Sequence, residues 1–210
     1  MHFTNQDIKT MDRVKRLKIM NSVSGIKPAN LLGTVSSKGV ENVAVFSSVF
    51  HLGSNPPLVG FILRPVDEVP RNTYDNFKEN GQFTINHIST SFIKNAHYTS
   101  AKFPAEESEF EKCNLTPEYI ANFKAPFVKE SAFKMGLEFV QEIDIELNGT
   151  KMIVGEVQHL VVPETSYIDD DIDLAAIDVA GISGLNTYYS LKKIATFPYV
   201  RLSNFPDFEQ

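Results

Sequence analysis

The sequence predicts a mainly β fold with flanking helices, in which the strands form a closed or nearly closed barrel. The first observation is that about six or seven short segments rich in β-branched and aromatic residues are separated by turn signals. The second is that these segments follow one another through short hairpin turns, of which Asn148-Gly149 is the strongest. A doubly wound parallel sheet is disfavoured, because no Gly-x-Gly-x-x-Gly follows any of the strands.

The first half of the chain opens with a helical pattern and continues with strands. Residues 5–20 place apolar side chains at helix-like spacing, and Pro28 ends this pattern. Strands are predicted over residues 30–36, 40–47, 58–63 and 82–88, with turns at residues 37–39 and 55–57. Between the last two strands, Thr73 is predicted to cap a short helix that Gly81 ends.

The second half is predicted to begin with helix and to return to strands. Residues 90–102 have a helical pattern, and residues 103–130 form an excursion with a short helix near residues 117–120. Residues 137–147 and 151–162 are predicted to pair around Asn148-Gly149. We treat residues 1–210 as one domain, with an N-terminal helix over about residues 5–20 and a C-terminal extension over about residues 165–210.

Composition excludes several classes of function. The 210 residues carry a net charge of −6, which disfavours a nucleic-acid-binding face, although a small phosphate ligand needs only one or two cations. The sequence has neither a signal-peptide pattern nor an apolar run long enough for a membrane span, so we expect a cytoplasmic protein. The histidines lack metal-ligand spacing and predict no metal site. Cys113, the only cysteine, is interpreted as a buried structural thiol.

Two segments have the chemistry of a phosphate site. The strand over residues 42–46 ends in Ser47 and Ser48, whose hydroxyl and N–H groups could donate to phosphate oxygens. Arg71-Asn72-Thr73 opens a predicted helix, and a helix N-terminus with a guanidinium nearby favours an anion; Arg64 is a second candidate cation. The alternative is that the serines only end a strand and that the arginines are ordinary surface charges.

Two further polar groups could line a pocket. His97 lies in the cluster His97-Tyr98-Thr99-Ser100, and Tyr188 lies in a tyrosine pair near the C-terminus that could flank a planar ring. A structural histidine and core or interface tyrosines are the alternatives, and the residues themselves leave this choice open.

The order of short motifs extends the prediction. Asn42-x-Ala44-x-Phe46-Ser47 is followed by Asn55-Pro56-Pro57, Arg64, Arg71-Asn72-Thr73-Tyr74-Asp75-Asn76, Phe83-Thr84-Ile85-Asn86, Ser108-Glu109-Phe110 and residues 153–157. Over roughly residues 25–165 this order resembles the flavin reductase-like family of FMN-binding split β-barrel proteins, and in particular its flavoredoxin-like branch. Arg71-Asn72-Thr73 stands where the family commonly has Lys-Asp-Thr, which keeps the positive charge and loses the acid.

The resemblance implies a split barrel of the FMN-binding type that dimerises and holds flavin at or near the subunit interface. It implies that residues 42–48 and 71–73 surround the phosphate and ribityl chain, and that the ring lies against residues 28–31. FMN is expected in preference to FAD, with NAD(P)H as a possible co-substrate. The predicted flavin-binding residues are Asn30, Leu31, Asn42, Ala44, Phe46, Ser47, Ser48, Arg64, Arg71, Asn72, Thr73, His97 and Tyr188.

The expected function is therefore that of an FMN-dependent oxidoreductase of flavin reductase type. NAD(P)H would reduce the flavin, which would reduce a second flavin or another acceptor. One alternative is a non-catalytic flavin-binding protein or electron carrier, because the sequence carries no nicotinamide-binding fingerprint. A more distant alternative is a related barrel that holds haem or a pyridoxal-type phosphate.

Overall fold

The computed structural model describes residues 1–66 and 71–208. Seven strands form one antiparallel sheet in the order β3-β2-β6-β9-β10-β5-β4. The strands of this sheet are β2 (Asn30–Val35), β3 (Glu41–Phe46), β4 (Val49–Ser54), β5 (Pro57–Leu63), β6 (Gln82–His87), β9 (Lys134–Ile145) and β10 (Thr150–Val161). Three small sheets accompany it, formed by β1 (Lys27–Pro28) with β13 (Ala180–Ser183) and β14 (Thr187–Ser190), by β7 (Pro117–Glu118) with β8 (Phe127–Val128), and by β11 (Tyr167–Ile168) with β12 (Asp171–Ile172).

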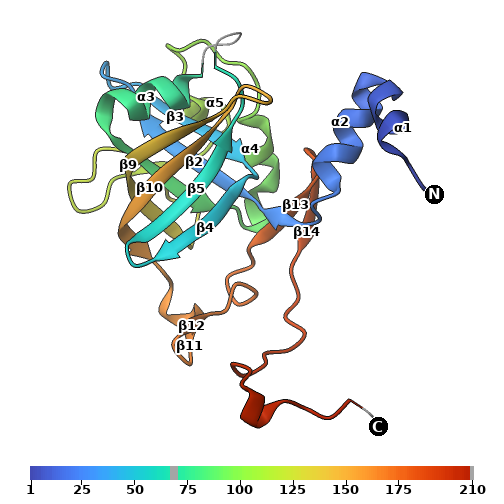
Figure 1. The fold of residues 1–210 in the computed structure, drawn as a ribbon. Helices are drawn as coiled ribbons and strands as arrows, with labels where there is room; N and C mark the ends of the chain where they lie inside the picture. Colours follow the sequence, from blue (N-terminus) through green and yellow to red (C-terminus); the bar gives the residue numbers. More distant parts are fainter. Residues whose placement is uncertain (67–70, 209–210) are drawn as a thin grey trace.

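Helices lie outside this sheet (Figure 1). They are α1 (Asn5–Thr10), α2 (Arg13–Ser22), α3 (Asn72–Asn80), α4 (Ile93–Tyr98) and α5 (Glu109–Lys112), with short 3-10 turns η1 (Thr90–Phe92), η2 (Glu164–Ser166) and η3 (Leu202–Asn204).

Connectivity shows that the large sheet is curled into a barrel. Strands β3 and β4 stand at the two opposite edges of the sheet, yet only Ser47 and Ser48 join them. The three Cα-to-Cα steps from Phe46 to Val49 span at most about 11 Å, so the two edges must approach each other at this point. The Ser48 hydroxyl holds this connection, the seam between β3 and β4, against β5, because it donates to the Ile62 carbonyl at 2.9 Å and accepts from the Ile62 N–H at 3.2 Å.

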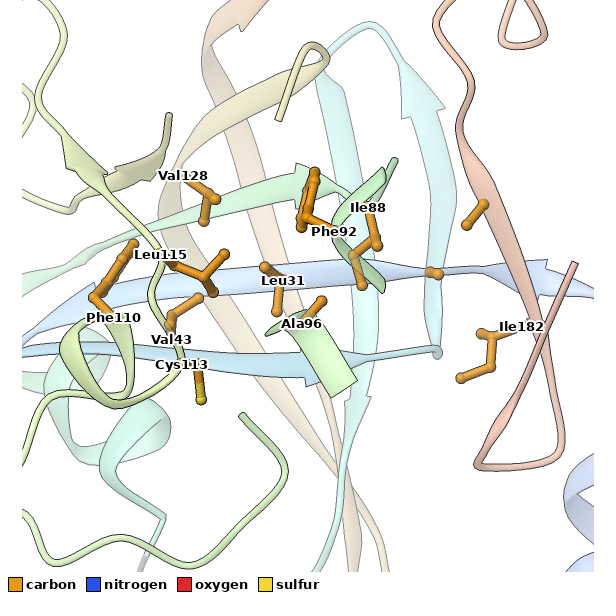
Figure 2. Packing of buried hydrophobic residues seen from close by; sticks show 12 residues of the cluster. Leu31, Val43, Ile88, Phe92, Ala96, Phe110, Cys113, Leu115, Val128 and Ile182 are labelled. Atoms are coloured by element: carbon orange, nitrogen blue, oxygen red, sulfur yellow. The ribbon is translucent and has the colours of Figure 1, made fainter. Parts of the chain in front are cut away.

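The two faces of β2 separate two apolar clusters, because successive side chains of a strand point to opposite faces. Leu32 lies in the barrel interior with Phe61, Phe83 and Ile85, where Phe61 and Phe83 meet edge to face at 5.6 Å. Leu31 points outward into a second cluster that α4 and α5 cover, together with the buried Cys113 (Figure 2). Since both faces of β2 are buried, the strand is apolar over most of its length.

The predicted Asn148-Gly149 hairpin is confirmed. It joins β9 and β10, Gly149 takes a positive φ of 70°, and the Asn148 side chain accepts a hydrogen bond from the Thr150 N–H at 3.1 Å. Strand β4 was not predicted from the sequence. Its exposed His51 and Leu52 break the apolar alternation that marks the other strands.

Four local predictions were wrong. Residues 5–20 form two helices, because Asp12 caps α2 by accepting from the Val14 and Lys15 N–H groups at 3.0 Å. Residues 90–102 form the turn η1 and the shorter helix α4. Residues 117–118 pair with β8 as a strand, and the short helix of this excursion is α5, earlier in the chain. Thr73 is not the cap of α3: the N-cap position is Arg71, and Thr73 lies in the first turn.

Candidate functional site

A buried polar network joins four elements at the predicted phosphate site, β2, β3, α3 and α5. The Asn42 side chain on β3 accepts from the Thr73 hydroxyl at 2.9 Å and from the Thr34 hydroxyl at 3.2 Å. Its amide nitrogen donates to a Glu109 carboxylate oxygen at 2.7 Å, and the Val43 N–H donates to the same oxygen at 3.3 Å. The network therefore fixes β3 against α3 and α5, and it explains why Thr73 faces inward instead of capping its helix.

Glu109 is the residue of this network that sequence reasoning did not assign to the site. Only 5% of its surface is exposed. Burial raises the pKa of the Glu109 carboxyl, while hydrogen bonds from its own and the Val43 backbone N–H and from Asn42 oppose that rise. The signal available in the sequence was the Ser108-Glu109-Phe110 motif, but the distance of 67 positions from Asn42 concealed the contact.

The N-terminus of α3 has the features of an anion site. Arg71 occupies the N-cap position, and no side chain caps the helix among the residues described. The Arg71 Nε atom is buried and has no hydrogen-bond partner in the described part of the chain. Free N–H groups, the helix dipole and an unpaired guanidinium N–H all favour a negative group at this place. Asn72, the first residue of α3, is half-buried beside Arg71.

A small cavity lies beside the Asn42 network. Its volume is about 130 Å³, and it is lined by Ser36, Val40, Asn42, Asn72, Asp75, Asn76, Ala105 and Glu107. Ligand pockets for larger organic molecules are typically about 300–1,000 Å³. This cavity is therefore too small for a three-ring ligand, and its two carboxylates, Asp75 and Glu107, repel a phosphate.

Asn30 and Phe46 lie together at one end of the barrel. They are register partners between β2 and β3, and Asn30 is also the register partner of His87 on β6. Asn30 is fully buried, yet neither its Oδ1 nor its Nδ2 atom has a partner in the part of the chain that the structure describes. The Nδ1 atom of His87 is likewise buried and without a partner there, and burial lowers the pKa of His87 to about 4. Buried polar groups are normally paired, so a bound water or ligand atom is expected at this end of the barrel.

The other predicted site residues between β2 and β4 lie in packing or strand-pairing positions of the barrel. Leu31 is fully buried in the outer apolar cluster, and its carbonyl accepts from the Asn86 side chain at 3.1 Å. Ala44 pairs with Leu32 across the sheet, and Phe46 packs edge to face on Phe61 at 5.3 Å. Ser47 is half-buried at the seam. Leu31, Ala44 and Phe46 can therefore meet a ligand only through backbone groups or exposed edges, whereas the side chain of the half-buried Ser47 is polar.

His97 and Tyr188 are brought together from distant parts of the chain. The His97 Nδ1 atom lies 3.2 Å from the Tyr188 hydroxyl, and the two rings meet edge to face at 5.8 Å. His97 comes from α4 and Tyr188 from β14, and burial raises the pKa of Tyr188. That these two residues line a ligand pocket remains a prediction. The structure adds that they contact each other, so the prediction now concerns them as a pair.

Arg64 stands apart from these groups. It is exposed just after β5, and among the described residues no hydrogen bond or ion pair joins it to another predicted site residue. In residues 1–66 and 71–208, no group of three or more His, Cys, Asp or Glu side chains could hold a metal ion. No helix in the described ranges is long and apolar enough to cross a membrane.

Comparison with known proteins identifies the fold. The chain matches a split-barrel structure from Shewanella frigidimarina NCIMB 400, assigned as a flavin reductase, with 44% identity and a TM-score of 0.91 over 95% of this chain and 100% of that one. It matches the flavoredoxin of Desulfovibrio vulgaris (Miyazaki F) with a TM-score of 0.71 and 24% identity, over 83% of this chain and 91% of that one. An uncharacterised protein of Aquifex aeolicus is 26% identical over 88% of this chain and 93% of its own length.

The described strands thus form a split barrel, as the order of sequence motifs implied. The sequence profile of the flavin reductase like domain matches residues 26–173, close to the range of roughly 25–165 that carries the motifs. Because that match covers well over half of the chain, the protein belongs to the flavin reductase-like family.

Proposed function

We propose that this protein is an FMN-binding oxidoreductase of flavin reductase type, which passes reducing equivalents from NAD(P)H to flavin or another acceptor. The observation that carries the proposal is the Arg71 guanidinium, whose buried Nε atom lacks a partner among the described residues at the uncapped start of α3. A terminal phosphate monoester is the group that such an arrangement fits best. This favours FMN over FAD, in which the phosphate is part of a diester.

The buried network supports this site from behind. Thr73 and Asn42 hold the first turn of α3 against β3, and Glu109 fixes the orientation of the Asn42 amide. We infer that these side chains position the phosphate loop and do not themselves bind phosphate, since their polar atoms are engaged with one another. Arg71, the N–H groups of Asn72 and Thr73, and the Ser47 hydroxyl are the proposed phosphate ligands.

The ring end of the site is proposed to lie at the barrel end marked by Asn30. Two unpaired polar atoms on Asn30 and one on His87 could satisfy hydrogen bonds of a polar ring edge or of the water between them. Bound flavin would supply the redox chemistry, and the protein would bind, orient and shield it. The apolar side chains exposed at both chain ends support a homodimer as the assembly that completes the site.

The test is flavin binding by the purified full-length protein. The absorption spectrum after purification and the quenching of FMN fluorescence on titration measure binding, and NAD(P)H oxidation with added FMN measures turnover. Arg71→Ala should weaken FMN binding by roughly 1.5–3 kcal/mol, which corresponds to roughly a ten- to hundredfold loss of affinity. Arg13→Ala, which removes an exposed arginine from α2, is the matched control and should leave affinity unchanged.

Absence of FMN binding at micromolar concentrations would contradict the proposal. Unchanged affinity in Arg71→Ala would show that the phosphate lies elsewhere. An electron carrier is the second candidate function, favoured by the structural similarity to a flavoredoxin and by the lack of a nicotinamide fingerprint in the sequence. Tight FMN binding with negligible NAD(P)H oxidation would identify this second function.

A further inference from the structure

Glu109 is a buried acid with no cation to balance its charge. Among the described residues, no ion pair joins it to a lysine, arginine or histidine. The buried lysine Lys134 is, by contrast, paired with Glu118. Charged side chains are rarely buried unless they are paired, so the unbalanced position of Glu109 needs an explanation.

Both hydrogen bonds that Glu109 accepts from β3 meet the same oxygen atom. The Asn42 Nδ2 atom lies 2.7 Å from Glu109 Oε2, and the Val43 backbone nitrogen lies 3.3 Å from that atom. A proton on the other oxygen, Oε1, would leave both of these bonds in place. The contact between α5 and β3 is therefore compatible with a charged and with a neutral Glu109.

Glu109 is also close to the proposed phosphate site. Only the side chain of Asn42 separates it from Thr73, because the Asn42 amide nitrogen donates to Glu109 and its Oδ1 atom accepts from the Thr73 hydroxyl at 2.9 Å. Thr73 lies in the first turn of α3, whose N–H groups are proposed to bind phosphate. A negative Glu109 and a phosphate dianion would thus repel each other across one asparagine, in an interior where charges are weakly screened.

We propose that Glu109 is a positioning residue of the phosphate site and that it takes up a proton from solvent when the flavin phosphate binds. The proton goes to Oε1, the two bonds from β3 stay in place, and the charge that would repel the phosphate is removed. This inference rests on the proposed function, because it concerns the phosphate of the bound flavin. The site then prefers a phosphate together with a proton, so flavin binding should weaken as pH rises.

Burial already favours the neutral form of this acid. Desolvation raises the pKa of Glu109 above its ordinary 4.5, although backbone N–H groups and the Asn42 amide oppose that rise. A phosphate nearby would raise the pKa further, since a like charge disfavours the ionised form. The neutral acid should therefore strengthen flavin binding below the pKa of the free protein. This gain should be lost as pH rises through that pKa toward the pKa of the complex.

The other ionisable groups around this acid do not explain such a pH dependence. Burial raises the pKa of the Cys113 thiol, which interacts with the Glu109 charge and stays neutral, and the Arg71 guanidinium stays charged. Asp75 and Glu107 line the cavity beside the network, but Asp75 is exposed and Glu107 is ion-paired with a lysine at 2.9 Å. Water and that lysine therefore screen their charges, whereas the charge of Glu109 is buried and unbalanced.

Glu109→Gln mimics the neutral acid and gives the first test. Its amide oxygen can accept both bonds from β3, and it carries no charge at any pH. The full-length variant should bind FMN as tightly as the wild type at pH 5 and about threefold or more tighter at pH 8, measured by fluorescence titration. Titration of the FMN phosphate itself cancels, because both proteins meet the same ligand at each pH. A ratio of the two affinities that stays constant with pH would overturn the proposal, since a merely structural role predicts that result.

Two further variants separate charge from positioning. Glu109→Ala removes the charge and the acceptor together, so it should weaken FMN binding at pH 5; affinity equal to that of Glu109→Gln would overturn the positioning role. Glu164→Gln removes the same charge from an exposed residue of η2 and is the matched control. Its affinity relative to the wild type should not change with pH, and a change like that of Glu109→Gln would assign the effect to net charge instead.

The proton itself is measured by calorimetry. Titration with FMN at pH 6.5, in two phosphate-free buffers of different ionisation enthalpy, should show more protons taken up per FMN by the wild type than by Glu109→Gln. Equal uptake would overturn the role given to Glu109 alone, whereas FMN binding by none of the proteins would contradict the proposed function itself. If the glutamine variant does not fold, infrared titration of the ¹³C-glutamate-labelled wild type replaces it. A carboxyl midpoint that FMN leaves unchanged would then overturn the proposal.

Discussion

The side-chain amide of Asn42 donates a hydrogen bond to the buried carboxylate of Glu109 at 2.7 Å. This contact ties β3, the strand that leads to the Ser47–Ser48 seam, to the short helix α5. Because Asn42 also accepts from Thr73, the same amide connects α5 with the start of α3. The geometry proposed for the phosphate site therefore depends on an acid that contacts Asn42 and is not itself among the proposed phosphate ligands.

Glu109→Gln should change how stability depends on pH. Burial raises the pKa of Glu109 above its ordinary 4.5, so the folded protein holds this proton more tightly than the unfolded chain does. Stability contributed by the neutral acid is present below pH 4.5 and is lost as pH rises through the raised pKa. The variant should lose about 1 kcal/mol near pH 4.5 through poorer hydrogen bonding, and this deficit should shrink toward pH 7.5. Urea unfolding at several pH values measures it.

Glu142→Gln is the control with the opposite sign. Partial desolvation would raise the pKa of Glu142, but hydrogen bonds from Tyr74 and Lys78 outweigh it and lower that pKa. The stabilising charge is therefore present above the ordinary pKa of 4.5 and is lost as pH falls, so the deficit of this variant should grow with pH. Parallel pH dependence in the two variants would contradict the role assigned to Glu109.

Tyr188→Phe should weaken flavin binding while leaving the fold intact. The substitution removes the hydroxyl that meets His97 and keeps the ring that packs on the outer cluster. A hydrogen bond of about 1 kcal/mol corresponds to an affinity loss of roughly fivefold if the pair orients the flavin. FMN fluorescence titration measures the loss. Tyr98→Phe changes an exposed tyrosine that also touches the His97 ring, so an equal loss in both variants would rule out a specific role for the pair.

The parts of this fold that could be predicted from the sequence are those determined by nearby residues. The Asn148-Gly149 turn, the alternation along β9 and β10, and the apolar run of β5 each depend on a few consecutive positions. The order of motifs added the barrel type. The location of Arg71 at the start of a helix was also predictable, because an arginine followed by polar residues begins a helical pattern there.

The parts that could not be predicted depend on pairing across long separations. Thr73 has the chemistry of a cap, but its hydroxyl instead donates to Asn42, which lies 31 positions away. Residues 117–118 form a strand only because β8 lies beside them. His87 and Asn30 look like ordinary strand ends in the sequence, and their unpaired polar atoms emerge only when β2 and β6 come together.

Gly33→Ala should destabilise the barrel. A Cβ atom at this position of β2 would collide with the Pro126 carbonyl and would lie 2.5 Å from the Thr84 hydroxyl oxygen. The Thr84 hydroxyl donates to that carbonyl at 2.7 Å, so the added methyl would also disturb this bond. Overpacking of this kind costs about 1–3 kcal/mol, measurable by urea unfolding. Gly53→Ala, where the new Cβ would meet only the Pro56 carbonyl at 3.3 Å, should cost less; equal costs would show that β2 can shift away from Pro126.

His87→Gln should remove much of the loss of stability at acid pH. Burial lowers the pKa of His87 from its ordinary 6.5 to about 4, so the unfolded chain binds this proton more readily than the folded protein does. The stability contributed by neutral His87 is present above pH 6.5 and is lost as pH falls toward 4, in total about 3 kcal/mol. The unpaired Nδ1 atom strengthens the effect, because a protonated ring needs acceptors for both N–H groups.

Urea unfolding from pH 7 to pH 4 tests this directly. The wild type should lose about 3 kcal/mol more than His87→Gln over that range. The exposed His51→Gln variant is the control and should follow the wild-type curve. If His87→Gln also follows that curve, His87 must gain an acceptor when protonated. The register partner of His87 across the sheet is Asn30, whose amide oxygen is itself unpaired among the described residues and is the candidate acceptor. Combining His87→Gln with Asn30→Leu would then separate the two residues, since loss of that acceptor should restore the acid sensitivity only where the histidine is present.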